Sequence, residues 1–309
     1  MDPLTKLYYS LKPAIPRRIQ ICLRRQLARY KRRKYAHTWP IDPSSSKPPE
    51  GWTGWPNGKK FALLLCHDVD TKKGSDTCLN LAEIEENLGF RSYFNFVPEG
   101  YHNSTSVLKE LRKRGFGIGI HGLNHDGKLF SSRKIFDQRA VKINDYLKKW
   151  NTRGFSSPSM HHNPDWMHAM NIAYSTSTFD TDPFEPQPDG VNTIFPFWVQ
   201  KSHSARGYLE IPSTMPQDHL LFVILREKNI DIWKKKLDWI AEHGGMALLN
   251  THTDYMCFEG QKSWAESYPL GYYIEFLKYI NRNYKDHYWH VLPNALAGFW
   301  KENLVRCNS

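Results

Sequence analysis

Short apolar runs alternate with longer amphipathic stretches from Phe61 to the end of the chain. The run FALLLC (61–66) is apolar at every position, which is typical of a strand buried on both faces of a parallel sheet. Comparable runs predict strands at 92–97, 117–122, 209–212, 220–225 and 246–250. Apolar residues at three- or four-residue spacing predict a helix ending at Leu88 and others at 105–115, 132–150, 231–243, 270–283 and 294–302. This alternation predicts an α/β fold with a parallel sheet or a barrel.

Residues 1–40 follow a different pattern. Pro16 suits the first turn of a helix, and an apolar stripe with arginines between its members follows: Ile19, Leu23, Leu27 and Tyr30. The stripe predicts a basic amphipathic helix over residues 15–34. Such a helix lies on an anionic membrane surface, packs its stripe on the protein body, or binds nucleic acid, and the sequence leaves these three alternatives open.

Two other segments have little periodicity. Residues 41–60 are rich in Pro, Gly and Ser and predict an extended linker, and residues 178–200 predict a long irregular loop of the kind that often carries function. The expected organisation is therefore a basic helical arm (1–40), a linker (41–60) and a catalytic domain (61–305).

Charge and cysteine usage refine this organisation. The net charge of +11 belongs almost entirely to residues 1–40, which hold eleven Lys or Arg and one Asp, so the body is nearly neutral. Because nothing besides this arm supports binding to nucleic acid, no nucleic-acid partner is expected. Five cysteines without a CxxC pair indicate neither a disulfide framework nor a cysteine-type zinc site, and they fit a reducing compartment. With no apolar run near the ~20 residues of a membrane span and no secretory leader pattern, the expected location is cytoplasmic, with peripheral attachment to the inner face of the membrane as an option.

Polar residues follow three of the predicted strands directly. Asp68 and Asp70 come after FALLLC, and His121 and His125 come after the strand at 117–122. In α/β folds, ligands gather at the carboxyl ends of the strands. Two imidazoles four residues apart can bind one metal ion, and histidine is a common metal ligand. The alternative for Asp70 is a cap on the following helix.

The third such position is His252, which follows the apolar strand residues 246–249 in the segment Asn250-Thr-His252-Thr-Asp254. A histidine there can act as a general acid tuned by a nearby carboxylate, although a single histidine is also often structural. One Asp and two His make a three-ligand metal site with open positions, which is the catalytic style of site. A second carboxylate and the distant histidine would supply a base and an acid, so the set suits hydrolysis of an amide or ester.

These residues resemble the motifs of the polysaccharide deacetylase (NodB-like, carbohydrate esterase family four) superfamily. HDVD (67–70) resembles its first motif, HGLNH (121–125) its second, with Gly122 at the usual Ser/Thr position, and His252 its last. In the third motif, Ser156 stands where the family has an Arg before Ser157 and Pro158, and Arg153 lies nearby. WPIDP (39–43), PPEGW (48–52) and FDTDPFEPQPDG (179–190) resemble a bacterial subgroup associated with envelope-polysaccharide biosynthesis.

The resemblance implies an irregular (β/α) barrel of about seven strands, a divalent metal that is usually Zn²⁺, and removal of an N-acetyl or other acyl group from a sugar of a bacterial envelope polysaccharide or its precursor. It implies that Asp70, His121 and His125 hold the metal, that Asp68 is the base and that His252 is the acid. The expected partner of His252 is Asp180 or Asp182. The candidate residues of the substrate wall are Ser157, Pro158, His161, Phe197, Trp198 and Tyr255.

Two other functions stay open at this stage. The absent Arg would fit a metal-dependent amide hydrolase that acts on a non-sugar substrate. The basic arm would also fit a catalytically inactive sugar-binding protein at a membrane surface.

Overall fold

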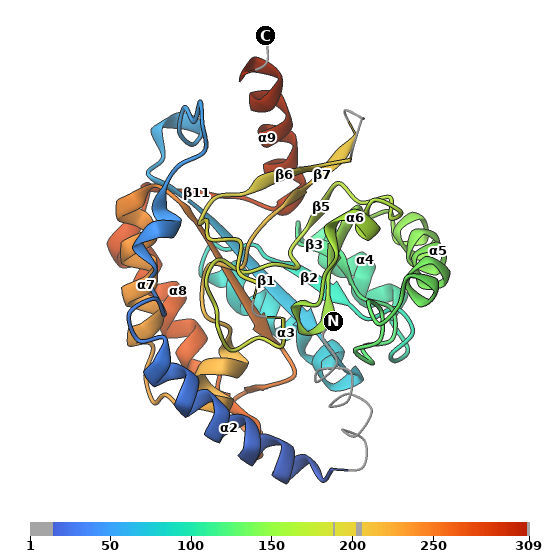
Figure 1. The fold of residues 1–309 in the computed structure, drawn as a ribbon. Coiled ribbons are helices and arrows are strands. Elements are labelled where there is room, and N and C mark those ends of the chain that lie inside the picture. Colours follow the sequence, from blue (N-terminus) through green and yellow to red (C-terminus); the bar gives the residue numbers. More distant parts are fainter. Residues whose placement is uncertain (1–14, 188, 202–205, 308–309) are drawn as a thin grey trace.

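A curled, mostly parallel sheet forms the centre of the computed structural model, which describes residues 15–187, 189–201 and 206–307. Strand β1 (Phe61–Val69), buried along its whole length, pairs with β8 (Met246–His252) on one side and with β2 (Tyr93–Phe96) on the other. The sheet continues through β3, β4, β5 and β7, and only the last pair, β7 with β6, is antiparallel. The nine strands assigned to this sheet in the described residues form a half-barrel with helices outside it (Figure 1).

The remaining elements follow in chain order. The strands of the main sheet other than β1, β2 and β8 are β3 (Gly117–His121), β4 (Gly154–Ser156), β5 (Tyr174–Ser175), β6 (Phe197–Gln200), β7 (Gly207–Glu210) and β11 (Tyr288–His290). The short strands β9 (Met256–Cys257) and β10 (Tyr268–Pro269) pair separately. The helices after the first are α3 (Lys72–Asn87), α4 (Thr105–Lys113), α5 (Arg133–Lys149), α6 (Pro164–Met167), α7 (Asp231–His243), α8 (Gly271–Tyr284) and α9 (Pro293–Cys307).

The irregular chain after β7 returns to β8. The Met215 N–H donates to the Leu248 carbonyl at 3.0 Å, and the Thr214 hydroxyl donates to the Met246 carbonyl at 2.7 Å. The predicted α/β fold with a barrel-like parallel sheet is confirmed by this arrangement.

One predicted strand is wrong. Residues 220–225 lie in η5 (His219–Leu225), a π-helical segment whose residues His219 to Ile224 are buried. A short apolar run is equally compatible with a buried strand and a buried helix turn, so the pattern alone did not separate them.

The N-terminal helix is present but meets the body by an unexpected face. In α2 (Arg17–Lys34), Ile21 and Ala28 are buried, and the Arg25 guanidinium donates to the Val223 carbonyl of η5 at 2.9 Å. The predicted stripe faces solvent, with exposed fractions of 51% for Ile19, 58% for Leu23, 53% for Leu27 and 63% for Tyr30. Packing of the stripe on the body is therefore not observed. Among the described residues, no helix combines the length and apolar character needed to cross a bilayer. The part of the predicted arm before residue 15 lies outside the described residues.

Residues 41–60 pack against the body and contain two short 3-10 helices, η2 (Pro43–Ser46) and η3 (Pro56–Gly58). Trp55 is buried, and its indole N–H donates to the Gly244 carbonyl at 2.8 Å. Trp52 contacts Trp55 and Trp300, which joins this segment to the C-terminal helix α9. Residues 41–60 were expected to form an extended linker, but they form a segment that is docked on the body.

Candidate active site

Three adjacent strands present polar side chains at one level of the sheet. Asp68 of β1 is the register partner of Asn95 on β2 and of His252 on β8. All three side chains are buried. The carboxyl end of β3 adds His121, and the loop after it adds His125, which has a left-handed backbone with φ of 54°.

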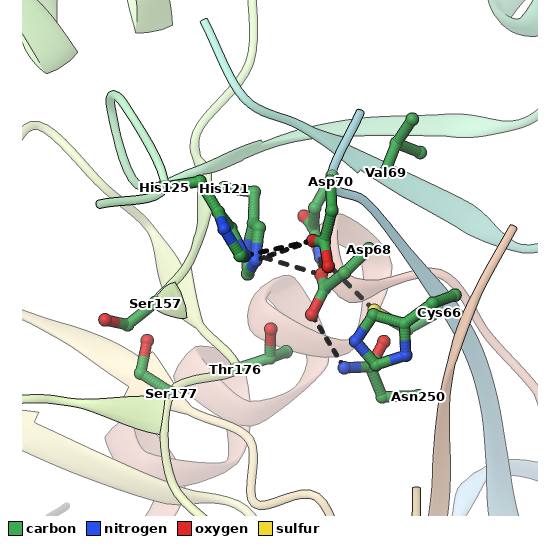
Figure 2. Close-up of polar contacts among 12 residues, drawn as sticks. Cys66, Asp68, Val69, Asp70, His121, His125, Ser157, Thr176, Ser177 and Asn250 are labelled. Atoms are coloured by element: carbon green, nitrogen blue, oxygen red, sulfur yellow. Dashed lines mark hydrogen bonds and ion pairs between the residues drawn. The ribbon is translucent and has the colours of Figure 1, made fainter. Parts of the chain in front are cut away.

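Asp70, His121 and His125 form a compact group of potential metal ligands. The Asp70 Oδ1 atom lies 3.4 Å from His121 Nε2 and 3.2 Å from His125 Nε2, and one ligand atom from each of the three residues lies within 4.8 Å of the others. Figure 2 shows both imidazole rings directed at the Asp70 carboxylate. One carboxylate and two imidazoles match the donor types that Zn²⁺ takes in catalytic sites.

The carboxylate and the imidazoles of this group stabilise each other's charged forms. Burial by itself would raise the pKa of Asp70, but the two imidazoles hold it well below its usual value. Burial would lower the pKa of His125, but the Asp70 carboxylate raises it overall. The Asp70 Oδ1 atom and the His121 Nδ1 atom are both buried without a hydrogen-bond partner among the described residues. The Asp70 oxygen is thus a buried acceptor that a cation would satisfy.

Asp254 holds the loop that carries Asp70. Its carboxylate accepts hydrogen bonds from the backbone N–H groups of Asp70 at 2.8 Å and Thr71 at 3.0 Å, and from the Thr71 hydroxyl. Because Asp254 performs this role at the start of α3, the alternative of Asp70 as a helix cap does not apply. The Asp70 carboxylate is directed at the histidines instead.

Two amides orient the Asp68 carboxylate. Asn95 Nδ2 donates to Asp68 Oδ1 at 2.8 Å, and Asn250 Nδ2 donates to Asp68 Oδ2 at 2.7 Å. Figure 2 shows Asn250 facing Asp68 from β8. Ser156, at the position of the family's Arg, is buried and its hydroxyl has no hydrogen-bond partner among the described residues, whereas Arg153 is exposed. Two neutral amides therefore hold the Asp68 carboxylate, and neither Ser156 nor Arg153 forms a hydrogen bond or ion pair with it in the described part of the chain.

His252 is paired with Asp218, and this corrects the expectation of Asp180 or Asp182. His252 Nδ1 lies 2.7 Å from Asp218 Oδ1, and the His252 backbone N–H donates to Asp218 Oδ2 at 2.8 Å. Burial opposes the charged imidazole, but the Asp218 carboxylate dominates and raises the pKa of His252 to about 10. His252 is therefore protonated at neutral pH.

Asp180 and Asp182 have other partners. Lys236 donates to Asp180 at 2.5 Å inside the body, and Asp182 accepts the Phe184 N–H at 2.8 Å in a turn. Their position in the irregular segment next to the motif residues made them plausible from sequence, but the fold directs both carboxylates away from His252.

Gly122 has a specific backbone requirement. Its φ is +59°, and a Cβ atom at this position would lie 2.7 Å from the ring of Pro158. Both the left-handed conformation and the close approach favour glycine. The Gly122 N–H donates to the Ser156 carbonyl at 2.9 Å, so the loop that carries His125 is tied to the end of β4.

A cavity of about 560 Å³ opens onto these residues. It is lined by Asp68, Asp70, His121, His125 and His252, and also by the predicted wall residues Ser157 and Tyr255. Pro158 and His161 instead line a small neighbouring cavity behind the Gly122 loop. Burial lowers the pKa of His161 to about 4. Phe197 and Trp198 lie on β6, an outer strand of the sheet, and do not line the large cavity, so the wall expected there is not observed.

Several residues of the site were not predicted from sequence. Asn95 had a signal, since it is the one polar residue in an otherwise apolar strand. Asp218 had none, because only the tertiary fold brings it to His252. His67, which the first motif includes, is directed away from the cavity: it contacts Thr251 Oγ1 at 2.7 Å and Glu85 Oε1 at 2.9 Å in a buried polar cluster.

No family model matches the sequence, and no curated protein matches it. Solved structures do match the fold. "Crystal structure of putative polysaccharide deacetylase from Mycobacterium smegmatis" superposes with a TM-score of 0.63 at 14% identity, covering 82% of this chain and 94% of that chain. The probable polysaccharide deacetylase from Pseudomonas aeruginosa PAO1 gives 0.61 at 14% identity, with 85% and 98% covered. The chain has the polysaccharide deacetylase fold.

The polysaccharide deacetylase fold is also found in a Puue allantoinase, with a TM-score of 0.63, 13% identity, and coverage of 85% of this chain and 97% of that one. Proteins of different names therefore share this architecture with the present chain. Because identities near 14% establish the fold alone, the functional argument depends on the site residues.

Proposed function

We propose that this protein is a metal-dependent carbohydrate deacetylase that removes an N-acetyl or other acyl group from a sugar. One observation carries the proposal: an oriented carboxylate (Asp68) and a protonated imidazole (His252) flank a three-residue ligand set in one cavity. A base, an acid and a cation site together are the groups that hydrolysis of an amide requires.

Asp70, His121 and His125 would hold the divalent cation, which we propose to be Zn²⁺ because of the mixed carboxylate and imidazole donors. When bound, the cation supplies Lewis acidity toward the acyl carbonyl and toward water. Asp254 contributes by fixing the backbone of Asp70, so that its carboxylate is ready before the cation arrives.

Asp68 is the proposed base. Both of its oxygens are held by amide donors, which leaves the remaining lone pairs free to accept a proton from the attacking water. The His121 ring separates the two carboxylates, with Nδ1 at 3.5 Å from Asp68 and Nε2 at 3.4 Å from Asp70. This spacing keeps the base next to the ligand set.

His252 is the proposed acid. Asp218 keeps it protonated, and its ring borders the cavity, so it can donate a proton to the departing amine. Ser157 and Tyr255 line the same cavity and are the proposed contacts for the sugar.

Two classes of substrate have support for the proposed hydrolysis. The first is a sugar of a bacterial envelope polysaccharide or its precursor, which the motif resemblance supports. The second is a non-sugar amide, which the fold similarity to an allantoinase supports. An assay for release of acetate from N-acetylated sugars, run beside an assay for ring opening of allantoin, separates them.

Asp68→Asn and His121→Ala test the mechanism. Asp68→Asn should lower the rate about 10²–10⁴-fold, as expected for loss of general-base catalysis, while the bound metal, measured by elemental analysis, stays at the wild-type level. His121→Ala should lose both activity and metal. Full activity in either variant would contradict the assignment, and Arg153→Gln, at an exposed position outside the cavity, serves as the control.

We also propose that α2 contacts an anionic membrane surface. Its exposed apolar stripe is flanked by exposed basic residues, including Arg18, Arg29 and Arg33, and such helices lie in the interfacial plane of a bilayer. Four described cysteines are free thiols, which agrees with a location on the cytoplasmic face. Binding should be stronger to vesicles with anionic lipid than to neutral vesicles, and weak to duplex DNA at the same salt concentration. Equal binding to neutral vesicles would contradict this proposal.

A further inference from the structure

The large cavity has one wall that does not belong to the barrel. Helix α2 runs along the end of the half-barrel at which β1 and β8 finish (Figure 1). It contributes Arg17, Gln20, Leu23, Arg24, Leu27 and Lys31 to the cavity lining, opposite the proposed catalytic residues from the strand ends. A substrate bound at Asp68 and His252 therefore lies beside this helix.

The cavity-facing and solvent-facing sides of α2 share two residues. Leu23 and Leu27 line the cavity, yet they are also members of the exposed stripe with Ile19 and Tyr30. The stripe from Ile19 to Tyr30 extends about 16 Å at 1.5 Å per residue. A continuous apolar path thus leads from inside the cavity onto the outer surface of the protein.

Arg24 is the available positive charge beside this path. Arg17 is bound to Glu266 at 2.9 Å, and Lys31 donates to the Pro183 carbonyl at 2.7 Å. Arg24 makes no hydrogen bond or ion pair with another residue in the described part of the chain, although its charge acts on Glu185 and His219 across the cavity.

The side facing Arg24 is suited to an anion. His219 is 92% buried, borders the cavity, and its Nε2 atom has no hydrogen-bond partner among the described residues. Burial and the nearby Arg24 charge hold the pKa of His219 well below its usual value, so its neutral ring would meet an anion as an N–H donor. Glu185 is an acidic group that also lines this side, and burial raises its pKa while the Arg24 charge opposes the rise. Guanidinium and imidazole groups are common phosphate ligands.

We propose that the substrate is an amphiphile in which the acylated sugar is joined through a phosphate to a hydrocarbon chain, with Arg24 and His219 binding the phosphate and Leu23 and Leu27 contacting the start of the chain. The inference rests on the proposed deacetylase function for the sugar end of the ligand. It explains why an apolar surface leads into a polar active site, which a free, water-soluble saccharide would not require.

Octyl phosphate, octanol and inorganic phosphate are suitable probes, measured by titration calorimetry below the micellar concentration. The full-length protein should bind octyl phosphate at least tenfold more tightly than octanol or phosphate. Arg24→Gln should reduce the affinity for octyl phosphate at least tenfold and leave that for octanol unchanged. Leu23→Ser combined with Leu27→Ser should lower the affinity for octyl phosphate toward the affinity for inorganic phosphate.

Matched variants from the same helix distinguish the cavity from the outer surface. Arg29→Gln and Ile19→Ser alter residues that do not line the cavity, and both should keep octyl phosphate affinity within twofold of wild type. Equal losses in Arg24→Gln and Arg29→Gln, or in the leucine and Ile19 variants, would overturn the proposal in favour of general surface adsorption. Arg24-dependent binding of uridine diphosphate without binding of octyl phosphate would overturn it in favour of a nucleotide-linked sugar.

The experiment separates this inference from the proposed function, because binding is measured without turnover. Asp68→Asn should bind octyl phosphate like wild type. Arg24-dependent binding in a protein that releases neither acetate nor another acyl group from acylated sugars would contradict the deacetylase function alone. Acetate release from soluble sugars with no octyl phosphate binding would contradict the amphiphilic substrate alone.

Discussion

His252 and Asp218 form a buried pair in which Nδ1 of the imidazole lies 2.7 Å from Oδ1 of the carboxylate. The second carboxylate oxygen accepts the His252 backbone N–H at 2.8 Å and the Tyr268 hydroxyl at 2.9 Å. Because Oδ1 also accepts the His219 backbone N–H at 2.7 Å, the carboxylate is fixed by four donors, and the outer nitrogen of the imidazole remains for the cavity.

Asp218→Asn should move the alkaline limb of the pH–rate profile to lower pH. The carboxylate raises the pKa of His252 to about 10, so the acid form persists through neutral and mildly alkaline pH in the wild type. Without that charge, burial would lower the pKa of His252, and activity would decline at a lower pH. The profile of kcat/KM from pH 5 to 11 measures the shift, with Asp180→Asn as the comparison. An unchanged alkaline limb would exclude His252 as the acid controlled by Asp218.

The same pair should make stability depend on pH. A histidine with a raised folded-state pKa stabilises the fold fully below its unfolded value near 6.5, and the contribution disappears as pH rises through the folded-state value. Here the loss should occur between about pH 6.5 and about pH 10. The melting temperature of the wild type should fall more steeply across this window than the melting temperature of Asp218→Asn. If the melting temperatures of the two proteins depend on pH in parallel, the pair contributes nothing to the pH dependence of stability.

Asn250→Ala should lower activity without releasing metal. It removes the 2.7 Å hydrogen bond to Asp68 Oδ2 and leaves a buried carboxylate with one amide donor. Loss of such an orienting group typically costs about 10–100-fold in activity. Steady-state kinetics with bound metal quantified test this, and Asn281→Ala removes a comparable amide bond, to the Leu88 carbonyl, far from the cavity. Equal losses in both variants would indicate a general effect on folding.

Gly122→Ala should destabilise the protein by about 1–3 kcal/mol, the usual cost of a non-glycine residue held in a strained backbone region. The added Cβ would also press against Pro158. Gly298→Ala is the matched control, because its Cβ meets nothing within 4 Å on an exposed part of α9, and it should stabilise by about 0.5–1 kcal/mol. Urea unfolding of both variants gives the two free energies, and a neutral Gly122→Ala would contradict the structural account of this loop.

Metal removal should lower the melting temperature. A ligand that binds only the folded state stabilises it by about 2.7 kcal/mol at a free concentration a hundred times its Kd. Differential scanning fluorimetry with and without a chelator, followed by readdition of Zn²⁺, measures the effect. His125→Ala should show no dependence on metal, whereas His102→Ala, which changes an exposed histidine, should behave like wild type. A metal-dependent shift that persists in His125→Ala would locate the cation elsewhere.

Much of the fold was predictable because it depends on local periodicity. The runs that became β1, β2, β3 and β8 are apolar at nearly every position, as buried parallel strands require. The wrong prediction at 220–225 has the same origin, since a buried π-helical turn has an equally apolar sequence. Periodicity identified the amphipathic helix near the N-terminus but did not tell which of its faces meets the body.

The candidate site was predictable where its residues follow strands directly, as Asp68, Asp70 and His121 do. The partners that orient them were not, because Asp218 and Asn95 reach their targets across 34 and 27 positions of the chain. Choosing among Asp180, Asp182 and Asp218 requires the path of the irregular chain between β5 and β8, and no local pattern encodes that path.

The common register of Asn95, Asp68 and His252 has a consequence for how the active site can change. Backbone hydrogen bonds between three strands set the spacing of Asp68, Asn95 and His252, so that spacing is independent of every loop around the cavity. Loops and the N-terminal helix can therefore diverge to accept new substrates while the distance between the proposed proton acceptor and the proposed proton donor is inherited unchanged. Chemistry and selectivity reside in separable parts of this molecule.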